Sequence, residues 1–73
     1  MMNEAQVKHH LHEELHDIQE YIAMYHESDE GMFKDIAMEE MTHAQILKDI
    51  IDAHGWNTAD IIAEWNQSIE MMK

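Results

Sequence analysis

Apolar and polar residues along this chain repeat with the period of an α-helix. In three stretches the apolar side chains return every three or four residues, which places them on one side of a helix. Proline is absent, there are only 2 glycines, and the helix-favouring residues Glu, Met and Ala are abundant. The sequence therefore predicts an all-α fold.

Three helices account for this pattern. We predict them at about residues 3–27, 29–54 and 58–72 of the 73-residue chain. The first two are joined by a short connection, which favours an antiparallel hairpin. We expect residues 1–73 to form a single domain, because so short a chain builds only one core.

Residues that favour helix ends stand at the expected junctions. Ser28 is expected to cap the N-terminus of the second helix. Gly55 is expected to end that helix in the left-handed conformation. Asn57 or Thr58 is expected to cap the third helix.

The third helix is predicted to carry its apolar residues on one side. They are Ile61, Ile62, Trp65, Ile69 and Met72. We expect this side to pack on the hairpin or on a neighbouring subunit, with Trp56 and Trp65 as anchors.

Each hairpin helix has one expected buried face, and charged residues interrupt both faces. In the first helix, alternating steps of three and four residues give Val7, Leu11, Glu14, Ile18, Tyr21 and Tyr25. In the second helix the same steps give Phe33, Ile36, Glu40, His43, Leu47 and Ile50. If the chain reverses near residue 28, Glu14 is level with His43 and lies in one layer with Glu40.

Three ionisable groups in one buried layer need a common partner, because an ionised carboxylate in a core costs several kcal/mol unless it is paired or bound to a metal. A second hairpin related by two-fold symmetry closes a four-helix bundle around this layer and its copy. The four glutamates of the dimer then balance two divalent ions. The sequence therefore predicts a homodimeric two-metal site with Glu14, Glu40 and His43 as ligands.

The chain is strongly acidic, with 16 acidic and 4 basic residues and a net charge of −12. This charge opposes binding to nucleic acid or anionic membranes and favours cations. Cysteine is absent, which excludes thiolate metal sites and iron–sulfur clusters. No signal peptide or membrane-spanning apolar run is evident, so we expect a cytoplasmic protein without nucleic-acid or membrane partners.

Two motifs stand in register on the predicted hairpin. They are Glu13-Glu14-Leu15 with the spacing Glu14-x6-Tyr21, and Glu39-Glu40-Met41-Thr42-His43. Their combination resembles the ferritin-like superfamily, in particular rubrerythrins and single-hairpin encapsulated ferritins. The resemblance implies a ferritin-like four-helix bundle that two copies of the chain complete as a homodimer or higher oligomer.

The resemblance also implies roles for individual residues. Glu14 and Glu40 would be metal-binding carboxylates, His43 a terminal nitrogen ligand, and Tyr21 a residue beside the site. The implied activity is a di-iron ferroxidase or oxidase that oxidises or sequesters iron, with dioxygen or peroxide as oxidant and two Fe per dimer. Mn or Zn also suits carboxylate and imidazole ligands. With a single hairpin and no cysteine-rich rubredoxin segment, the chain is not expected to be a complete rubrerythrin peroxidase.

Several neighbouring residues have a structural as well as a functional interpretation. Asp17, one turn after Glu14, is either an auxiliary ligand or a surface residue. Tyr21 is either next to the metals or an ordinary core tyrosine. Glu13 and Glu39 are expected to be solvated. The 8 methionines are expected to fill the core and interfaces rather than to bind copper.

A second motif competes with this assignment. The segment from His12 to His16 matches His-Glu-x-x-His, the zinc-binding helix of metalloproteases. The chain is too short to offer much of a substrate cleft, and both histidines are expected to point away from the buried face. A surface zinc or nickel site at His9, His12 and His16 is a further alternative, as are solvated histidines.

Two functions without catalysis also remain open. In the first, Zn(II), Mn(II) or Fe only neutralises the glutamate layer and stabilises a helical interaction module. In the second, the polar layer lies on the surface of an interaction module without metal. In that case Glu14→Ala and Glu40→Ala would change the stability little.

Overall fold

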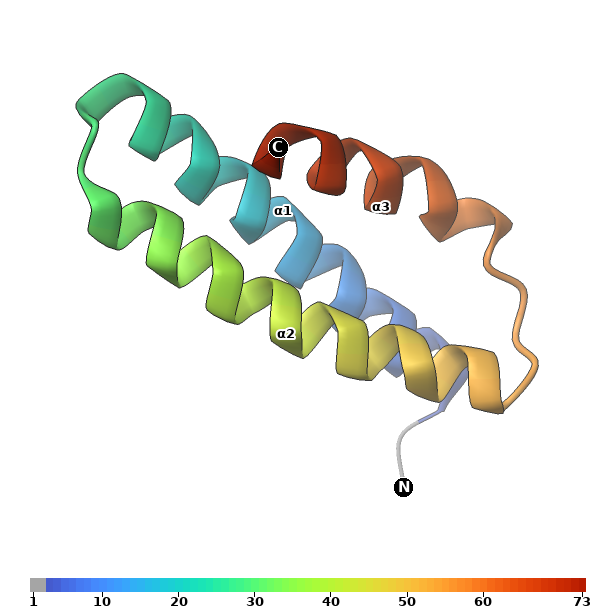
Figure 1. The fold of residues 1–73 in the computed structure, drawn as a ribbon. Coiled ribbons are helices and arrows are strands. Elements are labelled where there is room, and N and C mark those ends of the chain that lie inside the picture. Colours follow the sequence, from blue (N-terminus) through green and yellow to red (C-terminus); the bar gives the residue numbers. More distant parts are fainter. Residues whose placement is uncertain (1–2) are drawn as a thin grey trace.

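The computed structural model describes residues 3–73, which form three α-helices: α1 (Glu4–Ser28), α2 (Gly31–Ala53) and α3 (Ala59–Met72). α1 and α2 form an antiparallel hairpin, and α3 turns back and lies along α1 (Figure 1). The predicted all-α fold of a hairpin and a short third helix is confirmed, with bounds that differ by at most two residues from those predicted. Within residues 3–73, none of the helices combines the length and the apolar character that crossing a membrane requires.

The turn between α1 and α2 differs from the prediction at Ser28. Its hydroxyl donates a hydrogen bond to the carbonyl oxygen of Met24 (2.7 Å) and accepts one from the backbone N–H of Glu30 (3.2 Å). Ser28 is thus the last residue of α1, and Asp29 reverses the chain in the left-handed conformation with a φ of 60°. The prediction that Ser28 caps α2 is wrong, because Glu30 occupies that position without a side-chain hydrogen bond.

The end of α2 matches the prediction at Gly55, which adopts a positive φ of 69°. The backbone N–H of Gly55 donates to the carbonyl oxygen of Asp52 (3.1 Å), and that of Trp56 donates to Ile51 (3.2 Å). These two bonds form a Schellman motif, in which glycine is preferred because it has no Cβ. At the start of α3, Thr58 is the N-cap, and the Asn57 side chain accepts a bond from the backbone of Ala59.

The apolar core joins all three helices. It consists of Val7, Leu11, Leu15, Ile18 and Ile22 of α1, Ala37, Ala44 and Ile51 of α2, and Ile61 and Trp65 of α3. α2 contributes two alanines, whose small side chains allow α1 and α2 to approach closely.

The core is rotated relative to the predicted buried faces. On α1, Leu15 and Ile22 are buried, whereas Glu14 and Tyr21 are only partly buried. On the predicted face of α2, the partly buried residues are Phe33, Ile36, Glu40 and Leu47, and the exposed ones are His43 and Ile50. The reason is that α3 packs against α1 and shifts the buried side of the hairpin towards itself. The predicted face of α1 thus shares Val7, Leu11 and Ile18 with the core, and its other positions lie at the edge of the core.

Polar contacts hold α3 in register with α1. His12 Nδ1 lies 2.9 Å from Glu64 Oε2, and Gln19 donates a hydrogen bond to the Ser68 hydroxyl at 3.0 Å. Ser68 is completely buried, and its hydroxyl donates to the carbonyl oxygen of Glu64 (3.0 Å). Of the two predicted locations for α3, the structure therefore shows packing on the hairpin of the same chain.

The predicted apolar side of α3 is correct except at one residue. Ile61 and Trp65 are buried, and Ile69 and Met72 are partly buried. Ile62 is instead 43% exposed, since it follows Ile61 and points about 100° away from it around the helix. Trp56 is partly buried and packs against the core, as expected of an anchor.

Candidate metal centre

Two carboxylates and one imidazole converge at the edge of the hairpin core. Glu14 comes from α1, and Glu40 and His43 come from α2. One ligand-type atom of each lies within 4.8 Å of those of the other two. The predicted layer of these three side chains therefore exists within a single chain.

Helix geometry explains why these side chains meet. Glu40 and His43 are three residues apart on α2, so they lie on the same side of the helix about one turn apart. On α1, Glu14 is flanked by Leu11, Leu15 and Ile18, which are all fully buried. Its carboxylate therefore leaves the helix directly beside the apolar core.

Glu14 lies in an environment that disfavours its negative charge. Its side chain is 26% exposed, and its Oε2 atom is buried without a hydrogen-bond partner. The pKa of Glu14 is raised from its ordinary value of 4.5 to about 7, first by burial, then by the adjacent Glu40 carboxyl group, and then by the charges of Asp17 and Glu13. An ionised Glu14 thus requires a positive partner at this position.

The nearest nitrogen does not supply that partner. His43 Nδ1 lies 4.0 Å from Glu14 Oε2, which is too far for a hydrogen bond. The His43 side chain is 56% exposed, so its ring is largely solvated. A cation that contacts Glu14, Glu40 and His43 together would satisfy the buried oxygen and offset the charges of both carboxylates.

The centre opens into a hollow of about 360 Å³ lined by His10, Glu14, His43, Ile46 and Leu47. This hollow lies on the side of the hairpin away from α3. His12, which contacts α3, precedes Glu14 by two residues. Two residues that far apart on a helix are separated by about 200° around its axis, so the Glu14 side chain points away from α3. α3 therefore leaves the centre open.

Tyr21 and Asp17 take different positions relative to the centre. Tyr21 is partly buried and stacks against Phe33 of α2, with ring centroids 6.4 Å apart. The ligand-type atom of Asp17 groups with those of His16 and Glu20 rather than with those of the centre. Asp17 acts on the centre through its charge, which contributes to the raised pKa of Glu14.

The His-Glu-x-x-His segment does not form one metal group in the described chain. His12 Nδ1 is paired with Glu64 of α3, whereas His16 is exposed and lies 3.8 Å from Glu20. Both line a hollow of about 360 Å³ together with His9, Glu13, Asp17 and Glu64. The two histidines lie away from the Glu14 side of the hairpin, as the sequence indicated.

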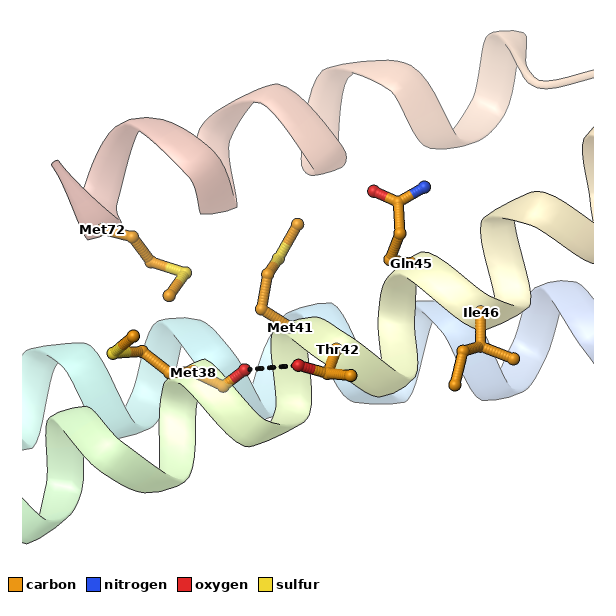
Figure 2. A pocket seen from close by; sticks show the side chains of 6 residues that line it. All are labelled: Met38, Met41, Thr42, Gln45, Ile46 and Met72. Carbon is orange, nitrogen blue, oxygen red and sulfur yellow. Dashed lines mark hydrogen bonds between the residues drawn. The ribbon is translucent and has the colours of Figure 1, made fainter.

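A second apolar surface lies between α2 and α3. It is lined by Met38, Met41, Thr42, Gln45, Ile46 and Met72. Figure 2 shows the side chains of Met38 and Met72 reaching towards each other from the two helices, with Met41 pointing towards α3. Met38 and Ile46 are exposed, so this methionine groove is a free apolar surface of the single chain.

Two residues that line the hollow of the metal centre were not predicted as site residues: His10 and Ile46. The signal for His10 was present, because it lies four residues before Glu14 and therefore on the same side of α1. The signal for Ile46 was present as well, because it lies three residues after His43 and therefore on the same side of α2.

The donor set of this centre consists of carboxylate oxygens and one imidazole nitrogen, a combination that suits divalent iron, manganese and zinc. The unpartnered Glu14 oxygen and the adjacent Glu40 provide the negative charge that such an ion requires. Comparisons with protein-family models, with curated proteins and with solved structures found no match for this chain.

Proposed function

We propose that two copies of this chain associate through the side of the hairpin away from α3 and enclose a carboxylate-bridged two-metal site of the ferritin-like kind. Glu14, Glu40 and His43 of each subunit hold the ions, and the protein oxidises Fe(II) with dioxygen or peroxide. Manganese and zinc are the alternative metals for this donor set.

The unpartnered Oε2 atom of Glu14 carries this proposal. A buried carboxylate oxygen is normally hydrogen-bonded, and each exception needs an explanation. Here one carboxylate oxygen of Glu14 lies within 4.8 Å of ligand-type atoms of Glu40 and His43, and Oε2 itself lies 4.0 Å from His43 Nδ1. A metal ion explains both the missing partner and the convergence of three ionisable groups at the edge of an apolar core.

The need for a second copy follows from the donors and the surface of one chain. One hairpin supplies three protein ligands, whereas the known two-metal carboxylate bundles use ligands from four helices. The side chain of Ile50 is 38% exposed and that of Ile46 is exposed on the same side as His43. A two-fold partner would cover this surface, exclude water from it and supply the second ligand set.

The protein residues then have separate tasks. Glu14 releases its proton when an ion binds, and the two carboxylates of each chain offset one divalent charge. His43 fixes a nitrogen donor one turn from Glu40. Iron bound by these residues would supply the electrons that reduce dioxygen or peroxide. In the dimer, the Ile46 and Leu47 side chains that line the hollow would limit access of water.

Elemental analysis and native mass spectrometry of the untagged chain test the site. We expect about one iron per chain in a dimer and loss of the metal in Glu40→Ala. Glu39→Ala is the matched control, because Glu39 is the exposed neighbour on the same helix and carries the same charge. Wild-type protein that takes up no Fe(II), Mn(II) or Zn(II), or equal metal content in both variants, would contradict the proposal.

Oxidation of Fe(II) tests the activity separately. Protein loaded anaerobically with Fe(II) and then exposed to air should form Fe(III) faster than buffer does. The Glu40→Ala variant should react at the rate of buffer and Glu39→Ala at the rate of wild type. A wild type that binds one metal per chain but oxidises iron no faster than buffer would retain the site and exclude the ferroxidase.

A non-catalytic, metal-stabilised interaction module is the second candidate function. The methionine groove between α2 and α3 favours it, because exposed methionines form adaptable binding surfaces. In this case a bound ion would raise the melting temperature without any oxygen chemistry.

A further inference from the structure

His10 lies beside the metal centre without belonging to the predicted ligand set. Its side chain lines the same hollow as Glu14 and His43. It precedes Glu14 by four residues, so both side chains lie on the same side of α1, with Cβ atoms about 5–6 Å apart. Side chains at this spacing on a helix are able to bind one metal ion together.

The imidazole of His10 is weakly held where it lies. Its Nδ1 atom is 3.9 Å from the nearest carboxylate oxygen, that of Glu13, and the side chain is 55% exposed. His12 is different, because Glu64 engages its ring at 2.9 Å. His9 also differs, since its Nε2 atom lies 3.1 Å from Glu13 and its side chain lines the hollow on the α3 side.

We infer that His10 is a further ligand of the two-metal centre and makes this centre prefer Fe(II) to Mn(II). The inference rests on the proposed function, because it assigns one more donor to that site. The ligand-type atoms that lie within 4.8 Å of one another are those of Glu14, Glu40 and His43. His10 therefore joins them by a change of side-chain rotamer, which its exposed position permits.

The preference follows from the donor set. Without His10 each chain offers two carboxylates and one imidazole, and with it two carboxylates and two imidazoles. Imidazole suits iron, nickel, copper and zinc ions, whereas carboxylate and water suit manganese and magnesium. An added nitrogen donor therefore strengthens the binding of Fe(II) more than that of Mn(II).

Binding of Co(II) and Mn(II) to the metal-free 73-residue chain tests this inference without any measurement of activity. Co(II) is stable in air. At a given site with nitrogen and oxygen donors, Co(II) generally binds more tightly than Fe(II), and Mn(II) binds more weakly than Fe(II). The variants are His10→Gln and, as the matched control, His9→Gln. Dissociation constants come from the visible absorption of bound Co(II) and from the electron paramagnetic resonance of free Mn(II).

We expect His10→Gln to weaken Co(II) binding by about tenfold or more, as loss of a supporting residue at a metal site does, and to weaken Mn(II) binding less. His9→Gln should leave both constants unchanged. His10→Glu adds an oxygen donor, so it should also lower the preference for Co(II) over Mn(II). General effects of charge or stability alter both ions alike and cancel in this ratio.

The two ways of failing are distinct. If wild type, His9→Gln and His10→Gln all bind metal with the same Co(II)-to-Mn(II) ratio, His10 is not a ligand and the two-metal site remains. If the wild type binds neither ion, the proposed function fails and this inference fails with it. Proton NMR of the Co(II)-bound protein provides a direct check, because bound Co(II) shifts the N–H signals of the imidazole rings that ligate it. The wild type should show the shifted signals of one more histidine than His10→Gln does.

Discussion

Glu14 of α1 and His43 of α2 face each other across the hairpin, with Glu14 Oε2 4.0 Å from His43 Nδ1. A divalent ion such as zinc forms bonds of about 2.1 Å to carboxylate oxygen and imidazole nitrogen. Only small rotations of the Glu14 and His43 side chains would therefore be needed for one ion to bind between these two atoms.

The stability of the metal-free protein should decrease as the pH rises. The folded chain holds a proton on Glu14 up to about pH 7, whereas the ordinary pKa of this group is 4.5. Relative to an ionised Glu14, the protonated carboxyl group stabilises the folded chain. This stabilisation is complete below the ordinary pKa of Glu14 and is lost as the pH rises through its pKa in the folded chain. Because Glu14 is partly solvated, we expect a loss on the order of 1 kcal/mol between pH 5 and pH 8.

Urea unfolding of wild type and Glu14→Gln at several pH values measures this loss. Relative to wild type, the unfolding free energy of Glu14→Gln should increase as the pH rises across this range. Glu27→Gln is the control, because Glu27 is exposed on the same helix and is not among the groups that raise the pKa of Glu14. A pH-independent difference between wild type and Glu14→Gln would show that Glu14 ionises normally in the folded chain.

A charge on the open side of the hairpin should prevent dimer formation. Ile50 is exposed on α2 two turns beyond His43 and on the same side of the helix, and Ile62 is similarly exposed on α3. We expect Ile50→Lys to be monomeric and poor in metal, because it places an unpaired charge in the proposed interface. Ile62→Lys should remain dimeric. Native mass spectrometry at matched concentrations distinguishes the two, and equal masses would place the interface elsewhere.

An enlarged side chain at Ala44 should destabilise the hairpin. Ala44 is fully buried between α1 and α2, so Ala44→Leu inserts atoms into an occupied core at a cost of about 1–3 kcal/mol. Ala63→Leu on the exposed side of α3 should have little effect. Thermal unfolding of both variants checks this. If Ala44→Leu melted like the wild type, the space between the helices would be larger than the structure indicates.

The two glycines should respond to alanine in opposite directions. Gly55 has a φ of +69°, so Gly55→Ala forces a left-handed alanine and should destabilise the chain by about 1 kcal/mol. Gly31 begins α2, and a Cβ there meets nothing within 4 Å. Gly31→Ala should therefore stabilise the chain by about 0.5–1 kcal/mol. Melting temperatures that move in the same direction for both would contradict this account of the two turns.

Local rules were sufficient for much of this protein. The apolar period and the absence of proline determined three helices, and Gly55 determined the end of α2. The antiparallel register placed Glu14 level with His43, because residue numbers alone fix which side chains are opposite in a hairpin with a short turn. For the same reason the convergence of Glu14, Glu40 and His43 was predictable.

The rotation of the helices was not predictable from the period. On α1, the steps of three and four residues fit Glu14 and Tyr21 as well as Leu15 and Ile22, because adjacent residues on a helix differ by only about 100°. Ala37 and Ala44 gave no strong apolar signal, although their small size is what suits them to the contact between α1 and α2.

The sequence by itself thus determined the helices, their turns and the level at which three ligand-type side chains meet. Only the tertiary structure decided which side of the hairpin is buried. α3 packs on α1 through Ser68, Trp65 and the His12–Glu64 pair, and this contact turns Leu15 inward and leaves Glu14 at the edge. The reason is physical: a single helix has several sides apolar enough to be buried, and the packing of a third element selects among them.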